Sequence, residues 1–171
     1  MAHDFDDYVA GRRRALLRFA TVLCGQPWLA DDIVSDVLGR AFERWQHIGA
    51  LDEPHAYVRR MVVNDYLSWR RRLTRTTPRP DLEPVLRLVD DETSAHAERD
   101  AMMRRLEALP RKQRVAVVLR YYAGLDDADI AAQLGCAQST VRSQISRALV
   151  TLRLDADGQR NDRRPTTGDE R

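Results

Sequence analysis

The sequence predicts an all-α protein made of two small helical domains joined by a flexible linker. Apolar residues recur every three or four positions in several separate stretches, which is the spacing of one helix face. Gly and Pro interrupt these stretches, and a proline-containing segment without any period separates the third stretch from the fourth. We therefore expect a domain at 4–73, a linker at 74–94, a second domain at 95–154 and a disordered tail at 155–171.

The first two helices are expected on either side of a break at Gly25 and Pro27. The first spans 4–24, with Asp4 or Asp6 as its N-cap. The second has two apolar rows that should both be buried, namely Leu29, Ile33, Val37, Ala41 and Trp45, and beside them Val34, Leu38 and Phe42. Its remaining face holds Asp31, Asp32, Ser35, Asp36 and Arg40, and seen alone this face is expected to be solvated.

A third helix should begin at Pro54, which fits a first helical turn, and run to about Arg72. Aromatic and arginine side chains are interleaved along it. Single-stranded DNA binding requires such a combination, because bases stack on flat rings and guanidinium groups hold phosphates. Core packing is the alternative role for about half of the aromatic residues. The candidate DNA-binding residues here are Arg60, Asn64, Trp69, Arg70 and Arg71.

Residues 125–152 are predicted to form a helix-turn-helix that follows further helices at 95–108 and after Pro110. Gly135 can adopt the positive φ of a tight helix exit, and the second helix should start near Gln138. Its outer face presents Ser139, Arg142, Ser143, Ser146 and Arg147. Arginine and small hydroxyl side chains on an exposed helix face suit a DNA major groove. A plain helical hairpin with a solvated face is the alternative.

Charge is distributed unevenly along the chain. Residues 59–79 hold seven arginines and one acid, 80–109 hold eight acids and four arginines, and 110–153 hold seven bases and three acids. This basic, acidic, basic order is typical of two nucleic-acid-facing modules joined by an acidic connector.

Several classes of protein lack support in the sequence. Cys24 and Cys136 lie far apart and are expected to be reduced, and the four histidines form no metal-ligand spacing. There is no phosphate-cradling glycine loop and no pairing of a nucleophile with a base. The N-terminus is acidic, unlike a signal peptide, and no apolar run approaches the roughly 20 residues of a membrane span. We therefore predict no catalytic residues, no cofactor, no metal, no membrane association and a cytoplasmic location.

Three stretches together resemble the extracytoplasmic-function (group 4) sigma factors of bacterial RNA polymerase, over about residues 5–153. The polymerase-gripping helix of that family resembles LADDIVSDVLGRAFERW, and its minus-10 segment resembles AYVRRMVVNDYLSWRRR. Its minus-35 domain resembles the stretch that starts at LEALPRK and continues through LRYY to the TVRSQ recognition helix. Ala137 departs from this pattern, because the family usually has a capping Ser there.

The resemblance implies a non-enzymatic subunit that binds core RNA polymerase and directs transcription initiation at promoter DNA. The duplex minus-35 element would meet Ser139, Thr140, Arg142, Ser143 and Arg147. The melted minus-10 strand would meet Arg60 and Asn64, and polymerase would meet Asp32, Asp36 and Arg40. An anti-sigma protein is a further expected partner.

Two other functions remain open on the sequence alone. A free-standing regulator that binds palindromic duplex as a dimer would explain 110–153, but it leaves 29–72 without a role. No self-association seam is visible, so a monomer is expected for the free chain. An enzyme acting on nucleic acid is the second alternative, and the missing catalytic groupings speak against it.

Overall fold

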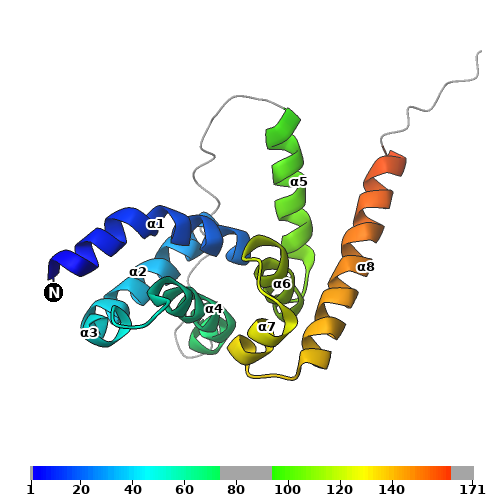
Figure 1. Ribbon diagram of the computed structural model, residues 1–171. Coiled ribbons are helices and arrows are strands. Elements are labelled where there is room, and N and C mark those ends of the chain that lie inside the picture. Colours follow the sequence, from blue (N-terminus) through cyan, green and yellow to red (C-terminus); the bar gives the residue numbers. More distant parts are fainter. Residues whose placement is uncertain (1, 74–93, 163–171) are drawn as a thin grey trace, which may run out of the picture.

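The computed structural model describes the backbone of residues 2–73 and 94–162 and the side chains of 4–68 and 98–153. These parts contain helices and connecting turns and no strand, so the all-α prediction is confirmed. Figure 1 shows an N-terminal region (2–73) beside a C-terminal region (94–162). The N-terminal region has α1 (Ala2–Cys24), α2 (Pro27–Glu43), α3 (Trp45–Ile48) and α4 (Pro54–Leu73). The predicted linker at 74–93 and the end of the tail at 163–171 lie outside the described residues.

Local sequence signals determine several helix ends in the N-terminal region. Gly25 follows α1 with φ 77°, a conformation that glycine adopts without steric cost, and Pro27 opens α2. Asp4 is not the N-cap that we expected, because α1 already begins at Ala2. Its carboxylate instead accepts a hydrogen bond from the indole nitrogen of Trp45 at 3.2 Å. Asp6 lies within α1 and is not a cap either.

The two apolar rows predicted for the second helix are buried, with one exception: their members pack in α2 against α1 and α4, and Trp45 is buried at the start of α3. Phe42 is 56% exposed, so its predicted burial is wrong. Each step of four residues advances by about 40° beyond a full helical turn, so a row of this spacing drifts around the helix and its last member leaves the core. Phe42 meets only the edge of the core, with its ring centroid 5.2 Å from that of Phe5.

The C-terminal region consists of α5 (Ser94–Ala108), α6 (Arg111–Val117), the π-helical turn η1 (Val118–Tyr122), α7 (Asp127–Leu134) and α8 (Gln138–Asp162). The turn η1 was not expected. Its wider winding changes the helical phase, and Tyr121 and Tyr122 are 64% and 50% exposed. Helix α8 includes residues 155–162, where we expected disorder. Adding residues to an existing helix costs little, and Ala, Gln and Arg favour it.

The two regions pack against each other, an arrangement that the sequence left open. Helix α1 contacts α5 and η1, while α4 contacts α6. Buried residues of both regions belong to one continuous apolar cluster, in which Leu16 and Val62 of the first region join Val115 and Ile130 of the second. The predicted DNA-binding helices α4 and α8 are therefore carried by a single packed core.

Candidate nucleic-acid interface

The helix-turn-helix of α7 and α8 is defined by its turn and its caps. The side chain of Asp126 accepts a hydrogen bond from the backbone nitrogen of Asp129 at 2.8 Å and so caps α7. Gly135 ends α7 with φ 63°, as predicted from its type. Helix α8 begins at Gln138, and the carbonyl of Ala137 accepts from the backbone nitrogens of Thr140 and Val141. The methyl side chain of Ala137 offers no capping oxygen.

Helix α8 buries one face and exposes the opposite one. Val141, Ile145 and Ala148 are buried in the core. The five residues predicted for duplex DNA lie on the other faces. Ser143 is half-buried, and the exposed members are Ser139, Thr140, Arg142 and Arg147. Residues 138–153 contain no acid, so the outer face of α8 is polar and positively charged.

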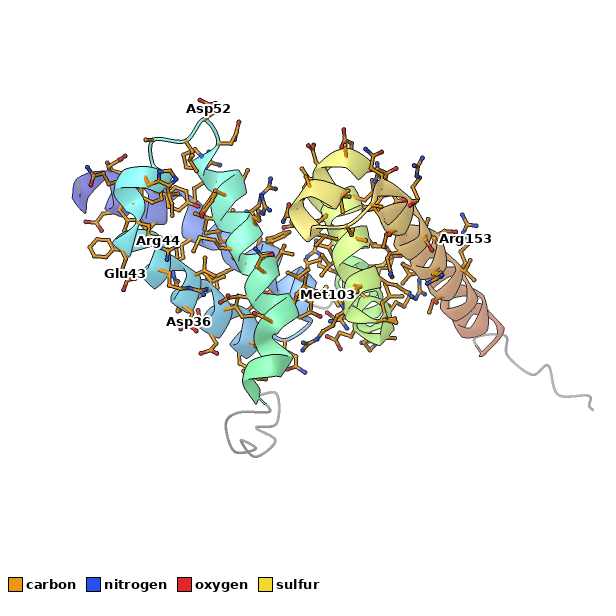
Figure 2. All side chains as sticks on the ribbon, turned by 90° about the horizontal axis from the view of Figure 1, so that it is seen from below. Asp36, Glu43, Arg44, Asp52, Met103 and Arg153 are labelled. Carbon is orange, nitrogen blue, oxygen red and sulfur yellow. The ribbon has the colours of Figure 1, made fainter. Side chains whose placement is uncertain are left out.

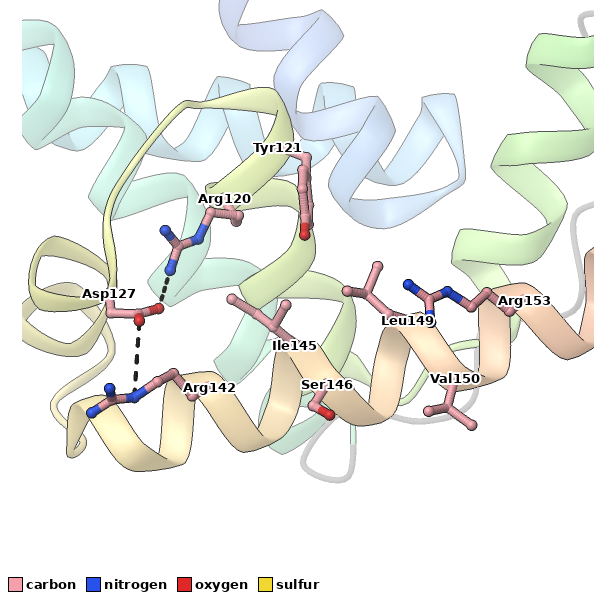
Figure 3. A pocket seen from close by; sticks show the side chains of 9 residues that line it. All are labelled: Arg120, Tyr121, Asp127, Arg142, Ile145, Ser146, Leu149, Val150 and Arg153. Atoms are coloured by element: carbon pink, nitrogen blue, oxygen red, sulfur yellow. Dashed lines mark hydrogen bonds and ion pairs between the residues drawn. The ribbon is translucent and has the colours of Figure 1, made fainter.

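A surface groove of about 420 Å³ runs beside α8 and places further residues near Arg142 (Figure 3). Asp127 of α7 forms an ion pair with Arg120 of η1, and its second oxygen lies 4.0 Å from Nε of Arg142. Arg153 lines the same groove. The sequence prediction missed Arg120, Asp127 and Arg153. Helical spacing could have found Arg153, because eleven residues make about three turns and return to the face of Arg142.

The predicted single-strand residues of α4 are only partly described. Arg60 and Asn64 are exposed on the same helix. Arg60 also donates a hydrogen bond from Nη2 to the carbonyl oxygen of Ala132 in α7, at 3.3 Å. The side chains of Trp69, Arg70 and Arg71 lie outside the described residues. The structure thus brings Arg60 against the helix-turn-helix rather than leaving it free on the surface.

The predicted polymerase face of α2 is acidic. Asp32 and Asp36 are exposed, and Figure 2 shows Asp36 with Glu43 and Arg44 on the side of the N-terminal region that faces away from the C-terminal region. Arg40 is half-buried, and its guanidinium forms an ion pair with the buried carboxylate of Asp65 in α4. Arg40 therefore ties α2 to α4, a role that its place in the sequence did not indicate.

Burial perturbs several titratable groups near the core. It raises the pKa of the Cys24 thiol to about 12, against the opposing effect of Arg114 and Arg111. Burial also raises the pKa of Tyr8 to about 12 and lowers the pKa of His55, whose Nδ1 lies 3.2 Å from the Tyr8 hydroxyl.

Both cysteines are free thiols. Among the described residues, no group of three His, Cys, Asp or Glu side chains could hold a metal ion.

Comparisons with known proteins place this arrangement in a family. A family model of sigma-70 region 2 matches residues 9–76, and one of sigma-70 region 4 matches 99–152. The chain is 36% identical to an RNA polymerase sigma-E factor of Streptomyces avermitilis, over all of this chain and 97% of that protein. The chain belongs to the extracytoplasmic-function sigma factors of RNA polymerase. This sigma factor is also 32% identical to SigM of Mycobacterium tuberculosis, over 86% of this chain and 74% of that one.

Two solved structures share the fold of this sigma factor. One is the sigma factor RpoE of Bartonella quintana in complex with the anti-sigma factor NepR, with a TM-score of 0.65, 24% identity, and 90% of this chain and 97% of that chain covered. The other is CnrH in complex with the cytosolic domain of CnrY, with a TM-score of 0.59 and 24% identity over 90% of this chain and 88% of that one. The sigma factor family is non-enzymatic. In the part of the chain that the structure describes, no helix is long and apolar enough to span a membrane.

Proposed function

We propose that this sigma factor binds core RNA polymerase through α2, duplex minus-35 DNA through α8 and the melted minus-10 strand through α4. The outer face of α8 supports the proposal most directly. It is held on a packed core by Val141, Ile145 and Ala148, and it exposes Arg142 and Arg147 without a neighbouring acid on the same helix. Such a face can enter a major groove, with guanidinium groups reaching guanine edges or phosphates.

Polymerase should also change the arrangement of the two regions. In the free chain, Arg60 contacts the carbonyl of Ala132 and so faces α7. Arg60 is exposed, but one of its terminal nitrogens is engaged by this carbonyl and can bind a base or phosphate fully only when the contact opens. We infer that binding to polymerase breaks the contact between Arg60 and Ala132. The free chain should bind promoter DNA weakly, because its two proposed DNA-binding helices are not held at the distance that separates the minus-35 and minus-10 elements.

We further propose an anti-sigma partner and a cytoplasmic location. Of the two solved structures named above, one is a complex with the anti-sigma factor NepR, and the other is a complex with the cytosolic domain of CnrY. Polymerase and promoter DNA are cytoplasmic in bacteria, so a sigma factor acts there.

The DNA-binding part of the proposal is tested with the sigma factor assembled on core polymerase. The promoter is obtained by run-off transcription on DNA of the host. Arg142→Ala and Arg147→Ala should each weaken promoter binding by about 1–3 kcal/mol and leave binding to core polymerase unchanged. Arg14→Ala removes an exposed arginine of α1 and is the control. Tight binding of duplex by the free chain, without a polymerase complex, would instead support the dimeric regulator.

The polymerase face is tested separately by charge reversal. Asp32→Arg should weaken co-elution with core polymerase in gel filtration, because it places a cation in an acidic strip. Asp7→Arg makes the same change at an exposed position on α1 and is the control, which should keep its affinity for core polymerase. Equal loss in both variants would show that net charge, and not the α2 face, determines the affinity.

A further inference from the structure

Asp127 lies between two arginines at the edge of the predicted DNA-binding face. One carboxylate oxygen pairs with Arg120, and the other lies 4.0 Å from Nε of Arg142. Figure 3 shows the three side chains in a row from η1 through α7 to α8. Three consecutive elements of the C-terminal region therefore meet at a single carboxylate.

The three side chains of this row differ in their exposure to solvent. The side chains of Asp127 and Arg120 are 25% and 30% exposed, whereas that of Arg142 is 66% exposed. A partly desolvated carboxylate that is held by one arginine is a fixed anchor, and its attraction to a second arginine is less screened than between two exposed groups. The inner end of the Arg142 guanidinium, at Nε, thus lies within ion-pair distance of a fixed carboxylate, while the side chain is largely open to solvent.

This arrangement leaves the terminal nitrogens of Arg142 available for recognition. Asp127 approaches Nε, and Figure 3 shows the two terminal nitrogens beyond Nε, at the outer end of the side chain. Bidentate reading of guanine uses two donors of one guanidinium, aimed at O6 and N7. An arginine that is oriented before binding loses less side-chain entropy when it makes this contact.

We propose that Asp127 is a positioning residue that orients Arg142 for base recognition in the minus-35 element. It increases discrimination between base sequences more than it increases total affinity, because its negative charge opposes attraction to phosphates in general. Arg120 supports this role by holding Asp127 and offsetting part of its charge. The inference rests on the proposed contact of Arg142 with DNA.

The test measures a ratio of affinities with the full chain assembled on core polymerase. Each variant is titrated with its promoter and with the same duplex carrying substituted minus-35 bases. Asp127→Asn should reduce this ratio about fivefold or more, while affinity for the substituted duplex stays equal or rises. The fraction of folded protein cancels in the ratio, so a loss of stability alone leaves it unchanged. Asp129→Asn removes an exposed carboxylate two residues away in the first turn of α7 and should keep the ratio within about twofold.

Arg142→Ala separates this inference from the proposed function. An unchanged ratio in that variant would overturn the assignment of Arg142 to the minus-35 element itself. A reduced ratio in Arg142→Ala, together with a ratio for Asp127→Asn equal to that of Asp129→Asn, would overturn only the positioning role. The double variant Asp127→Asn with Arg142→Ala should resemble Arg142→Ala, because Asp127 acts through that arginine. Additive losses would also contradict the inference.

Discussion

His55 shows how one side chain makes stability depend on pH. It is half-buried near the start of α4, next to the Tyr8 hydroxyl, and burial followed by the charges of Arg59 and Arg12 lowers its pKa below 6.5, while Glu53 opposes this shift. A base with a lowered pKa in the folded state binds its proton more readily in the unfolded chain. Its contribution to stability is therefore complete above pH 6.5 and is lost as the pH falls from there towards the lower folded pKa.

We predict that His55→Asn flattens the pH dependence of stability below pH 7. The amide cannot take up a proton, so the difference in free energy of unfolding between pH 7 and pH 5 should be smaller in this variant, measured by urea titration at each pH. Tyr8→Phe removes the hydrogen-bond partner but keeps the burial that mainly lowers the pKa, and it should retain the slope of the wild type. If the free energy of unfolding of His55→Asn changes with pH as steeply as that of the wild type, groups other than His55 cause the acid sensitivity.

At the scale of a single element, α8 combines the proposed DNA-binding face with an N-terminus that has no side-chain cap. Asp126 caps α7 with its side chain, but the equivalent position before α8 is Ala137, whose carbonyl alone takes part in the first turn. The backbone nitrogens at the start of α8 therefore lack the side-chain acceptor that serine, threonine or aspartate would supply.

Ala137→Ser should stabilise the protein by about 1 kcal/mol, because a serine oxygen at this position can accept from the first-turn nitrogens of α8. The free energy of unfolding in urea measures the effect. Ala132→Ser makes the same substitution at an exposed position inside α7 and should lower stability by a few tenths of a kcal/mol, roughly, since serine is a poorer helix former than alanine. Equal effects of the two substitutions on stability would show that the first-turn backbone nitrogens of α8 already have hydrogen-bond acceptors.

For the molecule as a whole, Arg114 of α6 connects the two regions. Its guanidinium is buried and donates to the carbonyls of Leu23 and Cys24 at the end of α1, and to those of Glu107 and Leu109 at the end of α5. The C-terminal ends of helices carry partial negative charge, so two of them can hold a buried cation without a carboxylate.

Arg114→Leu should lower the free energy of unfolding by about 3 kcal/mol, because it leaves buried carbonyls without donors. It should also loosen the contact between the regions, seen as a larger radius of gyration in small-angle scattering. Arg104→Leu removes an exposed arginine of α5 and should change neither quantity measurably. Unchanged stability and size in Arg114→Leu would show that water replaces the guanidinium and that apolar packing alone holds the regions together.

Most helices, several of their ends and the family could be predicted from the sequence, because these depend on local properties. Apolar spacing identifies a helix face, Pro27 and Pro54 suit first turns, and Gly25 and Gly135 allow the positive φ of a helix exit. The polar face of α8 followed from the same periodicity. The predicted burial of Phe42 was wrong, because a row of every fourth residue drifts around the helix and away from the core.

Only the tertiary structure decided which charges meet. Arg40 pairs with Asp65, Arg142 lies beside Asp127, and Arg114 reaches the end of α1, although none of these partners is adjacent in the sequence. Periodicity shows that a side chain leaves its own helix on a given face, but the partner depends on the angle and register at which a second helix packs there. The docking of the two regions, which brings Arg60 to α7, is set in the same way by the fit of their apolar surfaces.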